Sequence, residues 1–111
     1  MSDDLFNIIY NKSLDLLSRR EHSFKEIKEK LSARFENKEI IESVIEKLRD
    51  NNLVNNMRYA EAYVSARKRK GFGPKKIAFE LSSKGVDESV TNSVIIEEGD
   101  WESADKLAFL K

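Results

Sequence analysis

The sequence predicts an all-α protein built from tandem three-helix repeats. Apolar residues recur at spacings of three and four along most of the chain, which is typical of helices that bury one face. Capping and turn residues interrupt this pattern where helices should begin and end. The whole pattern returns after a shift of 50 residues. At 111 residues the chain is long enough to bury a modest core.

The first repeat is expected to contain three helices. The first spans residues 5–18, and its apolar face consists of Phe6, Ile9, Tyr10, Leu14 and Leu17. A shorter second helix begins after Ser23, because Ser23 and Glu26 have the spacing of a capping box. Asn37 suits the cap of a third helix. The apolar stripe of that helix contains Ile40, Ile41, Val44, Ile45 and Leu48.

The second repeat follows from superposing the chain on itself. Ser23, Ile27, Leu31, Asn37, Val44 and Ile45 fall on Gly73, Ile77, Leu81, Asp87, Val94 and Ile95. Pro74 suits the first position of the middle helix, where its missing N–H has no partner to lose. Asp87 corresponds to the cap of the last helix. We expect a first repeat over residues 1–52, a second over residues 53–99 and the opening helix of a third over residues 100–111.

The third repeat is expected to be incomplete. Trp101, Ala104, Leu107, Ala108 and Leu110 have helical spacing, but no second or third helix follows them. The pattern therefore indicates a shortened chain. We expect Trp101 to anchor this helix on the second repeat, and backbone amides from about Leu107 onward to exchange faster than those of residues 40–48.

Charge is balanced overall but unevenly distributed. The chain has 20 basic and 20 acidic residues, of which 8 basic and 2 acidic lie within residues 58–84. A solvated helix face is one explanation of such a run. A binding surface is the other, because Lys75 and Lys76 lie in the first turn of a helix, where the macrodipole disfavours cations.

Little in the sequence indicates catalysis. The chain has no Cys and one His, so no thiolate metal site, cofactor or catalytic group is expected. We expect His22 to be structural or exposed to solvent. The run from Gly71 to Pro74 lacks the Lys-Ser/Thr ending of a phosphate-binding loop. No apolar run approaches membrane-spanning length, and we expect a cytoplasmic protein without a membrane partner.

The aromatic residues divide into core candidates and one open case. Tyr59, Tyr63 and Phe79 have helical spacing and are expected in the core, although such rings can also stack on nucleobases. Phe72 lies between two glycines in the turn that follows four consecutive basic residues, which we call the basic run: Arg67, Lys68, Arg69 and Lys70. The sequence leaves open whether Phe72 packs inward or makes an exposed contact.

Four segments resemble the bacterial RecX family of RecA regulators. They are REHSFKEIKEKL over residues 20–31, NLVNNMRYAEAY over residues 52–63, KRKGFGPKKIAFELSSKGV over residues 68–86, and the Asp100–Trp101 pair. The chain departs from the family at Asn55 and Asn56, where the family has two Asp residues. The resemblance implies three-helix repeats in an elongated, curved arrangement and binding to a RecA filament on single-stranded DNA.

The resemblance and the basic run together predict the binding residues. They are Arg67, Lys68, Arg69, Lys70, Phe72, Lys75, Lys76 and Lys84. The predicted function is to restrain filament growth and activity, with the chain as a monomer that contacts single-stranded DNA directly or through the filament. A stand-alone nucleic-acid-binding module is the alternative, because each three-helix unit also resembles a helix-turn-helix bundle. A purely structural scaffold is a third possibility.

Overall fold

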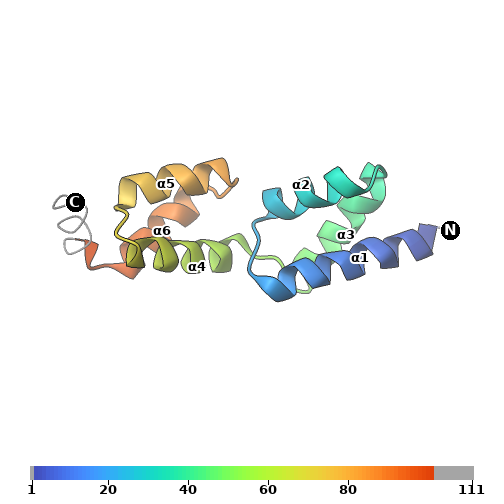
Figure 1. Cartoon of the computed structure of the whole chain (residues 1–111), viewed down its shortest axis with the longest axis horizontal. Helices are drawn as coiled ribbons and strands as arrows, with labels where there is room; N and C mark the ends of the chain where they lie inside the picture. The colour runs from blue at the N-terminus through green and yellow to red at the C-terminus, as the bar shows by residue number, and fades with distance from the viewer. Residues whose placement is uncertain (1, 102–111) are drawn as a thin grey trace. The chain divides into compact units, whose positions relative to one another are not determined.

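The computed structural model describes residues 2–101, and these form six α-helices in two units (Figure 1). The first unit ends at Asn55 and contains α1 (Ser2–Arg19), α2 (Phe24–Arg34) and α3 (Lys38–Asp50). The second begins at Asn56 and contains α4 (Asn56–Arg69), α5 (Pro74–Ser83) and α6 (Glu88–Glu98). The prediction of an all-α chain with tandem three-helix repeats is confirmed.

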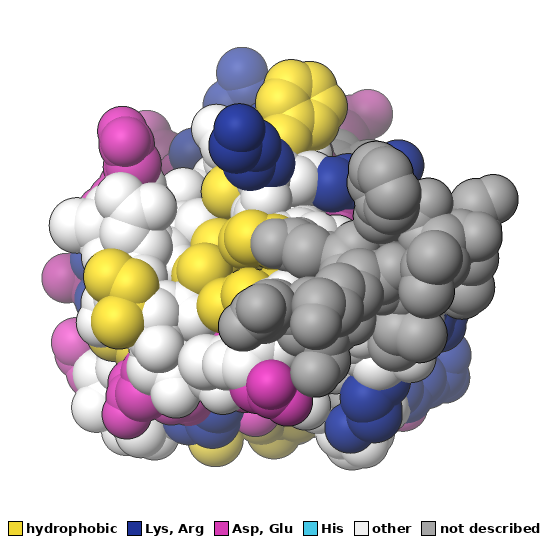
Figure 2. All heavy atoms as spheres, turned by 90° about the vertical axis from the view of Figure 1, so that its left-hand side faces the viewer, with side chains coloured by type: hydrophobic (Ala, Val, Ile, Leu, Met, Phe, Trp, Pro, Cys, Tyr) yellow, Lys and Arg dark blue, Asp and Glu magenta, His cyan; other side chains and the backbone are white. Residues whose placement is uncertain are grey.

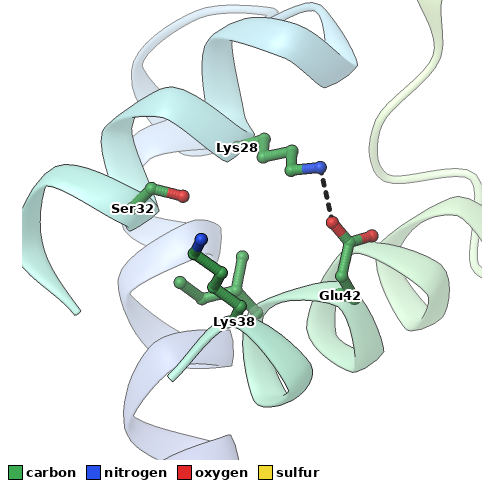
Figure 3. A pocket seen from close by; sticks show the side chains of 5 residues that line it. Lys28, Ser32, Lys38 and Glu42 are labelled. Carbon is green, nitrogen blue, oxygen red and sulfur yellow. Dashed lines mark ion pairs between the residues drawn. The ribbon is translucent and has the colours of Figure 1, made fainter. Parts of the chain in front are cut away.

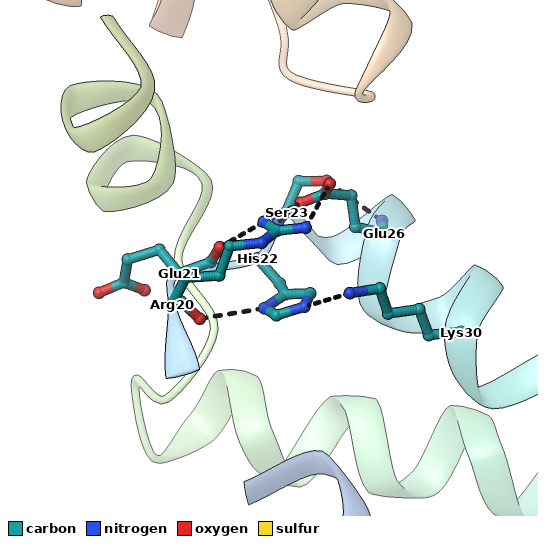
Figure 4. Close-up of polar contacts among 6 residues, drawn as sticks. All are labelled: Arg20, Glu21, His22, Ser23, Glu26 and Lys30. Carbon is teal, nitrogen blue, oxygen red and sulfur yellow. Dashed lines mark hydrogen bonds and ion pairs between the residues drawn. The ribbon is translucent and has the colours of Figure 1, made fainter. Parts of the chain in front are cut away.

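In the first unit, side chains cap both internal helix starts as the sequence predicts. The backbone N–H of Glu26 donates to Ser23 Oγ over 3.1 Å, and the N–H of Ser23 donates to Glu26 Oε1 over 3.2 Å (Figure 4). This is the reciprocal capping box. Asn37 Oδ1 accepts from the N–H of Ile40 over 3.1 Å at the start of α3. Asn52 follows α3 with φ of 56°, the left-handed conformation that Asn tolerates.

The second unit begins its helices with less help from side chains. Gly73 stands where Ser23 stands in the first unit and offers no capping oxygen, while Pro74 is the first residue of α5. Asp87 lies at the predicted cap position of α6, but its side chain makes no capping hydrogen bond. Gly71 has φ of 93°, a conformation that favours glycine and that turns the chain between α4 and α5.

The core of the first unit lies where its three helices meet. Ile9 from α1, Ile27 and Leu31 from α2, and Leu48 from α3 are fully buried in one cluster. Ile9 and Leu48 belong to the predicted apolar faces, and Ile27 and Leu31 belong to the repeated pattern of the sequence. The amphipathic spacing therefore identified most of the buried surface. The prediction that Leu14 belongs to the apolar face of α1 is wrong, because Leu14 is exposed.

The core of the second unit repeats this arrangement. Val64 from α4, Ile77 and Leu81 from α5, and Val94 from α6 are buried in one cluster. Ile77 and Leu81 are 50 positions after Ile27 and Leu31, and all four have no exposed surface. The sequence repeat is therefore also a repeat of core positions.

Among the described residues, no helix combines the length and apolar character needed to cross a membrane.

Candidate interaction surface of the second unit

The basic run lies at the end of α4, and Lys75 and Lys76 lie at the start of α5, on the other side of the turn that contains Phe72. Figure 2 looks toward this end of the second unit, where dark-blue Lys and Arg side chains stand beside hydrophobic surface at the upper edge. The predicted binding residues do not all face solvent. They fall into an inward group and an outward group.

Arg67 belongs to the inward group. Its Nε donates to Glu80 Oε1 over 3.0 Å and its Nη2 donates to Glu80 Oε2 over 2.9 Å, so the two side chains form a bidentate pair. Tyr63 donates its hydroxyl to the same carboxylate over 2.9 Å. Burial alone would raise the pKa of Glu80, but the hydrogen bonds from Arg67 and Tyr63 outweigh it, and the pKa falls below its usual value. Arg67 therefore joins α4 to α5.

Phe72 packs against the core and also lies between two cations. Its half-buried ring contacts the core cluster of the second unit. The guanidinium carbon of Arg67 lies 3.8 Å from the ring centroid, and Lys76 Nζ lies 5.2 Å from it. The ring therefore holds the turn against the unit and fixes the positions of the flanking bases.

Lys68 also points inward, toward the end of α6. Its Nζ donates to the carbonyl oxygen of Gly99 over 2.6 Å and lies 4.0 Å from a carboxylate oxygen of Glu98. A cation at a helix C-terminus is favoured by the macrodipole and by the free carbonyl groups there. Trp101 lies beneath Lys68, with 5.4 Å from Nζ to the ring centroid. The indole N–H of Trp101 donates to the carbonyl oxygen of Ile95 over 2.6 Å.

Trp101 thus contacts the second unit as the sequence predicts, and it is part of that unit's hydrophobic cluster. The remainder of the predicted third-repeat helix, including Leu107, lies outside the described residues.

Four basic residues form the outward group, which we call the basic corner: Arg69, Lys70, Lys75 and Lys76. All four side chains are exposed, and within residues 2–101 none of them forms an ion pair. Arg69 Nη1 donates to Ser65 Oγ over 3.4 Å. Lys84, the last predicted binding residue, is half-buried at the C-cap of α5 and is not part of the basic corner.

The prediction that Phe79 belongs to the core is wrong. Its side chain is 77% exposed, whereas Tyr59 is buried and Tyr63 is half-buried as predicted. Phe79 lies two residues after Ile77 and two before Leu81, which places it off their face of α5. The repeat already indicated that this position faces solvent, because the charged residue Glu29 stands at the equivalent position of the first unit.

No group of three or more potential metal ligands occurs among the described residues. The arrangement offers positive charge and one exposed ring, which are means of binding.

Family models match both units. The model described as the first three-helix domain of RecX matches residues 10–48, and the model of the second three-helix domain matches residues 55–95. Together they cover most of the chain.

Individual relatives agree with this assignment. The chain is 36% identical over 101 residues to a regulatory protein RecX of Pseudomonas fluorescens, covering 90% of this chain and 65% of the relative. It is 36% identical over 94 residues to one of Halorhodospira halophila, covering 84% and 58%. The chain thus spans less than two thirds of the length of these curated relatives.

Solved structures show the same similarity. A crystal structure of RecX from Lactobacillus salivarius superposes with a TM-score of 0.80 at 34% identity, covering 90% of this chain and 65% of that one. A second crystal structure of a regulatory protein RecX superposes with a TM-score of 0.85 at 28% identity, covering 96% and 53%. The two matched domains, the sequence identity and the shared fold together show that this chain belongs to the RecX family.

Proposed function

We propose that this chain regulates the RecA recombinase by binding the filament that RecA forms on single-stranded DNA. In this role it restrains filament growth and activity in recombination and the DNA damage response. The relatives named regulatory protein RecX support a regulatory and not a catalytic role. The chain spans less than two thirds of the length of these relatives. That it restrains the filament without the rest of that length is therefore part of the proposal.

The basic corner is the observation that carries this proposal. Lys75 and Lys76 lie in the first turn of α5, where the helix dipole makes positive charge unfavourable. Among the described residues neither lysine forms an ion pair, although the charge of Lys76 is close enough to Glu80 to help lower the pKa of that carboxyl. An external partner with acidic groups or phosphates would compensate this cost. Arg67, Lys68 and Phe72 support the corner from inside, because their contacts fix the turn and the end of α6.

Charge reversal at the corner tests the proposal. We expect the double variant Lys75→Glu/Lys76→Glu to abolish inhibition of the RecA ATPase on single-stranded DNA and to keep the helical content seen by circular dichroism. The side chains are exposed and α5 starts with acidic residues more favourably than with basic ones, so the fold should persist.

Lys25→Glu is the matched control, since Lys25 is the repeat equivalent of Lys75. It should leave inhibition unchanged. Full inhibition by the double variant would refute the assignment of the basic corner.

A stand-alone nucleic-acid-binding module is the second candidate, favoured by the exposed ring of Phe79 beside unpaired cations. Binding that neutralises several phosphates weakens steeply with added salt. Titrations against bare single-stranded DNA, bare duplex DNA and a RecA-coated strand at two salt concentrations separate the candidates. Tight, salt-sensitive binding to bare DNA without preference for the coated strand would favour the module.

A further inference from the structure

Each unit carries a pocket between its second and third helices. In the first unit the pocket has a volume of about 190 Å³ and is lined by Lys28, Ser32, Lys38, Ile41 and Glu42 (Figure 3). In the second unit it has a volume of about 270 Å³ and is lined by Ala78, Phe79, Ser82, Val86, Glu88, Thr91 and Asn92. The shift of 50 residues places every lining residue of the first pocket on a lining residue of the second. The two pockets are therefore equivalent positions of the repeat.

In the pocket of the first unit, two of the lining side chains pair with each other. Lys28 Nζ and Glu42 Oε1 form an ion pair over 2.6 Å across the opening, drawn as a dashed line in Figure 3. Ile41 is 1% exposed and carries no polar atom on its side chain. Among the described residues that line this pocket, no buried polar side-chain atom is left without a partner.

The pocket of the second unit has neither the ion pair nor the buried isoleucine. Ala78 and Asn92 replace the ion pair, and Thr91 replaces the buried Ile41. Thr91 is 3% exposed, and its hydroxyl is buried without a hydrogen-bond partner. Ser13 and Ser43 show the usual solution, in which the hydroxyl donates to the carbonyl oxygen four residues earlier. Since Thr91 does not do this, its hydroxyl is an unsatisfied buried group in the wall of the pocket.

The rim of this pocket carries the exposed ring of Phe79. Lys75 and Lys76 lie four and three residues before Phe79 on α5, so each is a neighbour of Phe79 on the helix surface, and Lys76 Nζ also lies 5.2 Å from the ring centroid of Phe72. Ser82 follows one turn later. A flat group stacked on Phe79 would thus have cations on one side and the pocket on the other.

We propose that this pocket receives an unpaired nucleobase of a single-stranded nucleic acid. The base stacks on Phe79, its edge bonds Thr91 and Asn92, and its phosphate lies beside Lys75 and Lys76. An apolar protein side chain would leave the Thr91 hydroxyl unpaired, and a free anion would meet the carboxylate of Glu88. A volume of about 270 Å³ also suits one ring, being below the range of drug-sized ligands. The inference goes beyond the proposed function, since base binding needs no recombinase.

The test measures binding of the full chain to a fluorescent single-stranded oligodeoxycytidylate by anisotropy. Cytosine is chosen because Glu88 and Asn92 can accept from its exocyclic amine. A strand of the same length with abasic sites in place of the cytidines reports phosphate binding alone. Phe79→Ala should weaken binding of the oligodeoxycytidylate about 5- to 150-fold, the effect of losing one stacked base, and leave abasic binding unchanged.

Thr91→Val tests the proposal independently of Phe79. Valine has the shape of threonine without the hydroxyl, so the variant should be at least as stable to urea as the original chain and yet bind the oligodeoxycytidylate more weakly. Ser32→Ala and Ser82→Ala form a matched pair in the two pockets. Only Ser82→Ala should weaken binding of the oligodeoxycytidylate.

Two results would overturn the proposal. One is equal affinity of the chain for the cytidine and abasic strands. The other is variants at Phe79 and Thr91 that weaken binding to a RecA-coated strand but not to the bare oligonucleotide, which would assign the pocket to a protein side chain. Neither result bears on the charge-reversal test at Lys75 and Lys76, so failure of this inference and failure of the proposed function are distinguishable.

Discussion

His22 shows at the scale of one residue how burial determines chemistry. Its ring is 1% exposed, and Nδ1 lies 3.0 Å from the carbonyl oxygen of Arg20. A carbonyl only accepts, so Nδ1 carries the proton and Nε2 accepts from Lys30 Nζ over 2.9 Å (Figure 4). Burial is the main cause that lowers the pKa of His22, and the charges of Arg20 and Lys30 add to it. The histidine is therefore structural, one of the two roles that the sequence allowed.

The first prediction concerns pH. Because the pKa of folded His22 is below its usual value of 6.5, the unfolded chain binds this proton first as pH falls. The free energy of unfolding should therefore be constant above about pH 6.5 and decrease as pH drops below it. Urea unfolding from about pH 7.5 to about pH 5.5 measures this, and His22→Gln should flatten the decrease.

The same site allows a direct titration, because the chain has a single histidine. Its ring-proton NMR signal should titrate below 6.5, and Lys30→Met should raise the pKa by removing a neighbouring positive charge. A His22 signal that titrates above 6.5 would contradict the arrangement in Figure 4.

At the scale of elements, the two repeats start their middle helices differently. Ser23 has φ of −74° and ψ of 162° and forms the full capping box, whereas Gly73 has φ of −82° and ψ of 171° and forms no side-chain cap. The backbone conformations are nearly the same. Glycine is therefore not required at position 73 by its backbone, in contrast to Gly71 with φ of 93°.

The second prediction exchanges these caps. Ser23→Ala should lower the free energy of unfolding by about 1 kcal/mol, and Gly73→Ser should raise it by a few tenths of a kcal/mol by adding a capping oxygen. The gain is smaller because Lys76 replaces the Glu26 that completes the box. Gly71→Ser is the control and should cost about 1 to 2 kcal/mol through its left-handed backbone. Equal effects at positions 71 and 73 in urea unfolding would show this reasoning to be wrong.

At the scale of the whole molecule, each unit has its own core. The buried clusters of the two units share no residue, and each contains one fully buried leucine at the same repeat position, Leu31 or Leu81. Every residue of each cluster comes from one unit, so the two leucines lie in separate cores. A substitution in one core should therefore lower the local stability of that unit more than that of the other.

The third prediction uses this pair of leucines. Leu31→Ala should cost about 2 to 5 kcal/mol by removing buried methyl groups and leaving a cavity. Amide hydrogen exchange should become faster in α2 and α3, while α5 and α6 keep their protection. Leu81→Ala should produce the reverse pattern. Equal loss of protection in both units from either variant would mean that the two cores unfold as one.

The sequence by itself determined the helices, their order, most of their caps and the family. These features depend on residues three or four apart, as in the capping box of Ser23 and Glu26, or on the shift that superposes Leu31 on Leu81. Such local interactions form wherever the chain is helical. Pattern alone was therefore sufficient for them.

Only the tertiary structure decided which bases face outward and what the second pocket contains. Arg67 and Lys68 are neighbours of Arg69 and Lys70 in an unbroken basic run, yet Glu80 holds Arg67 across 13 residues and Gly99 holds Lys68 across 31. The pocket that Thr91 and Phe79 line likewise depends on the packing of α5 against α6. Contacts between helices select the direction of each side chain, and residue type does not encode them. The basic run was thus visible in the sequence, but the basic corner was not.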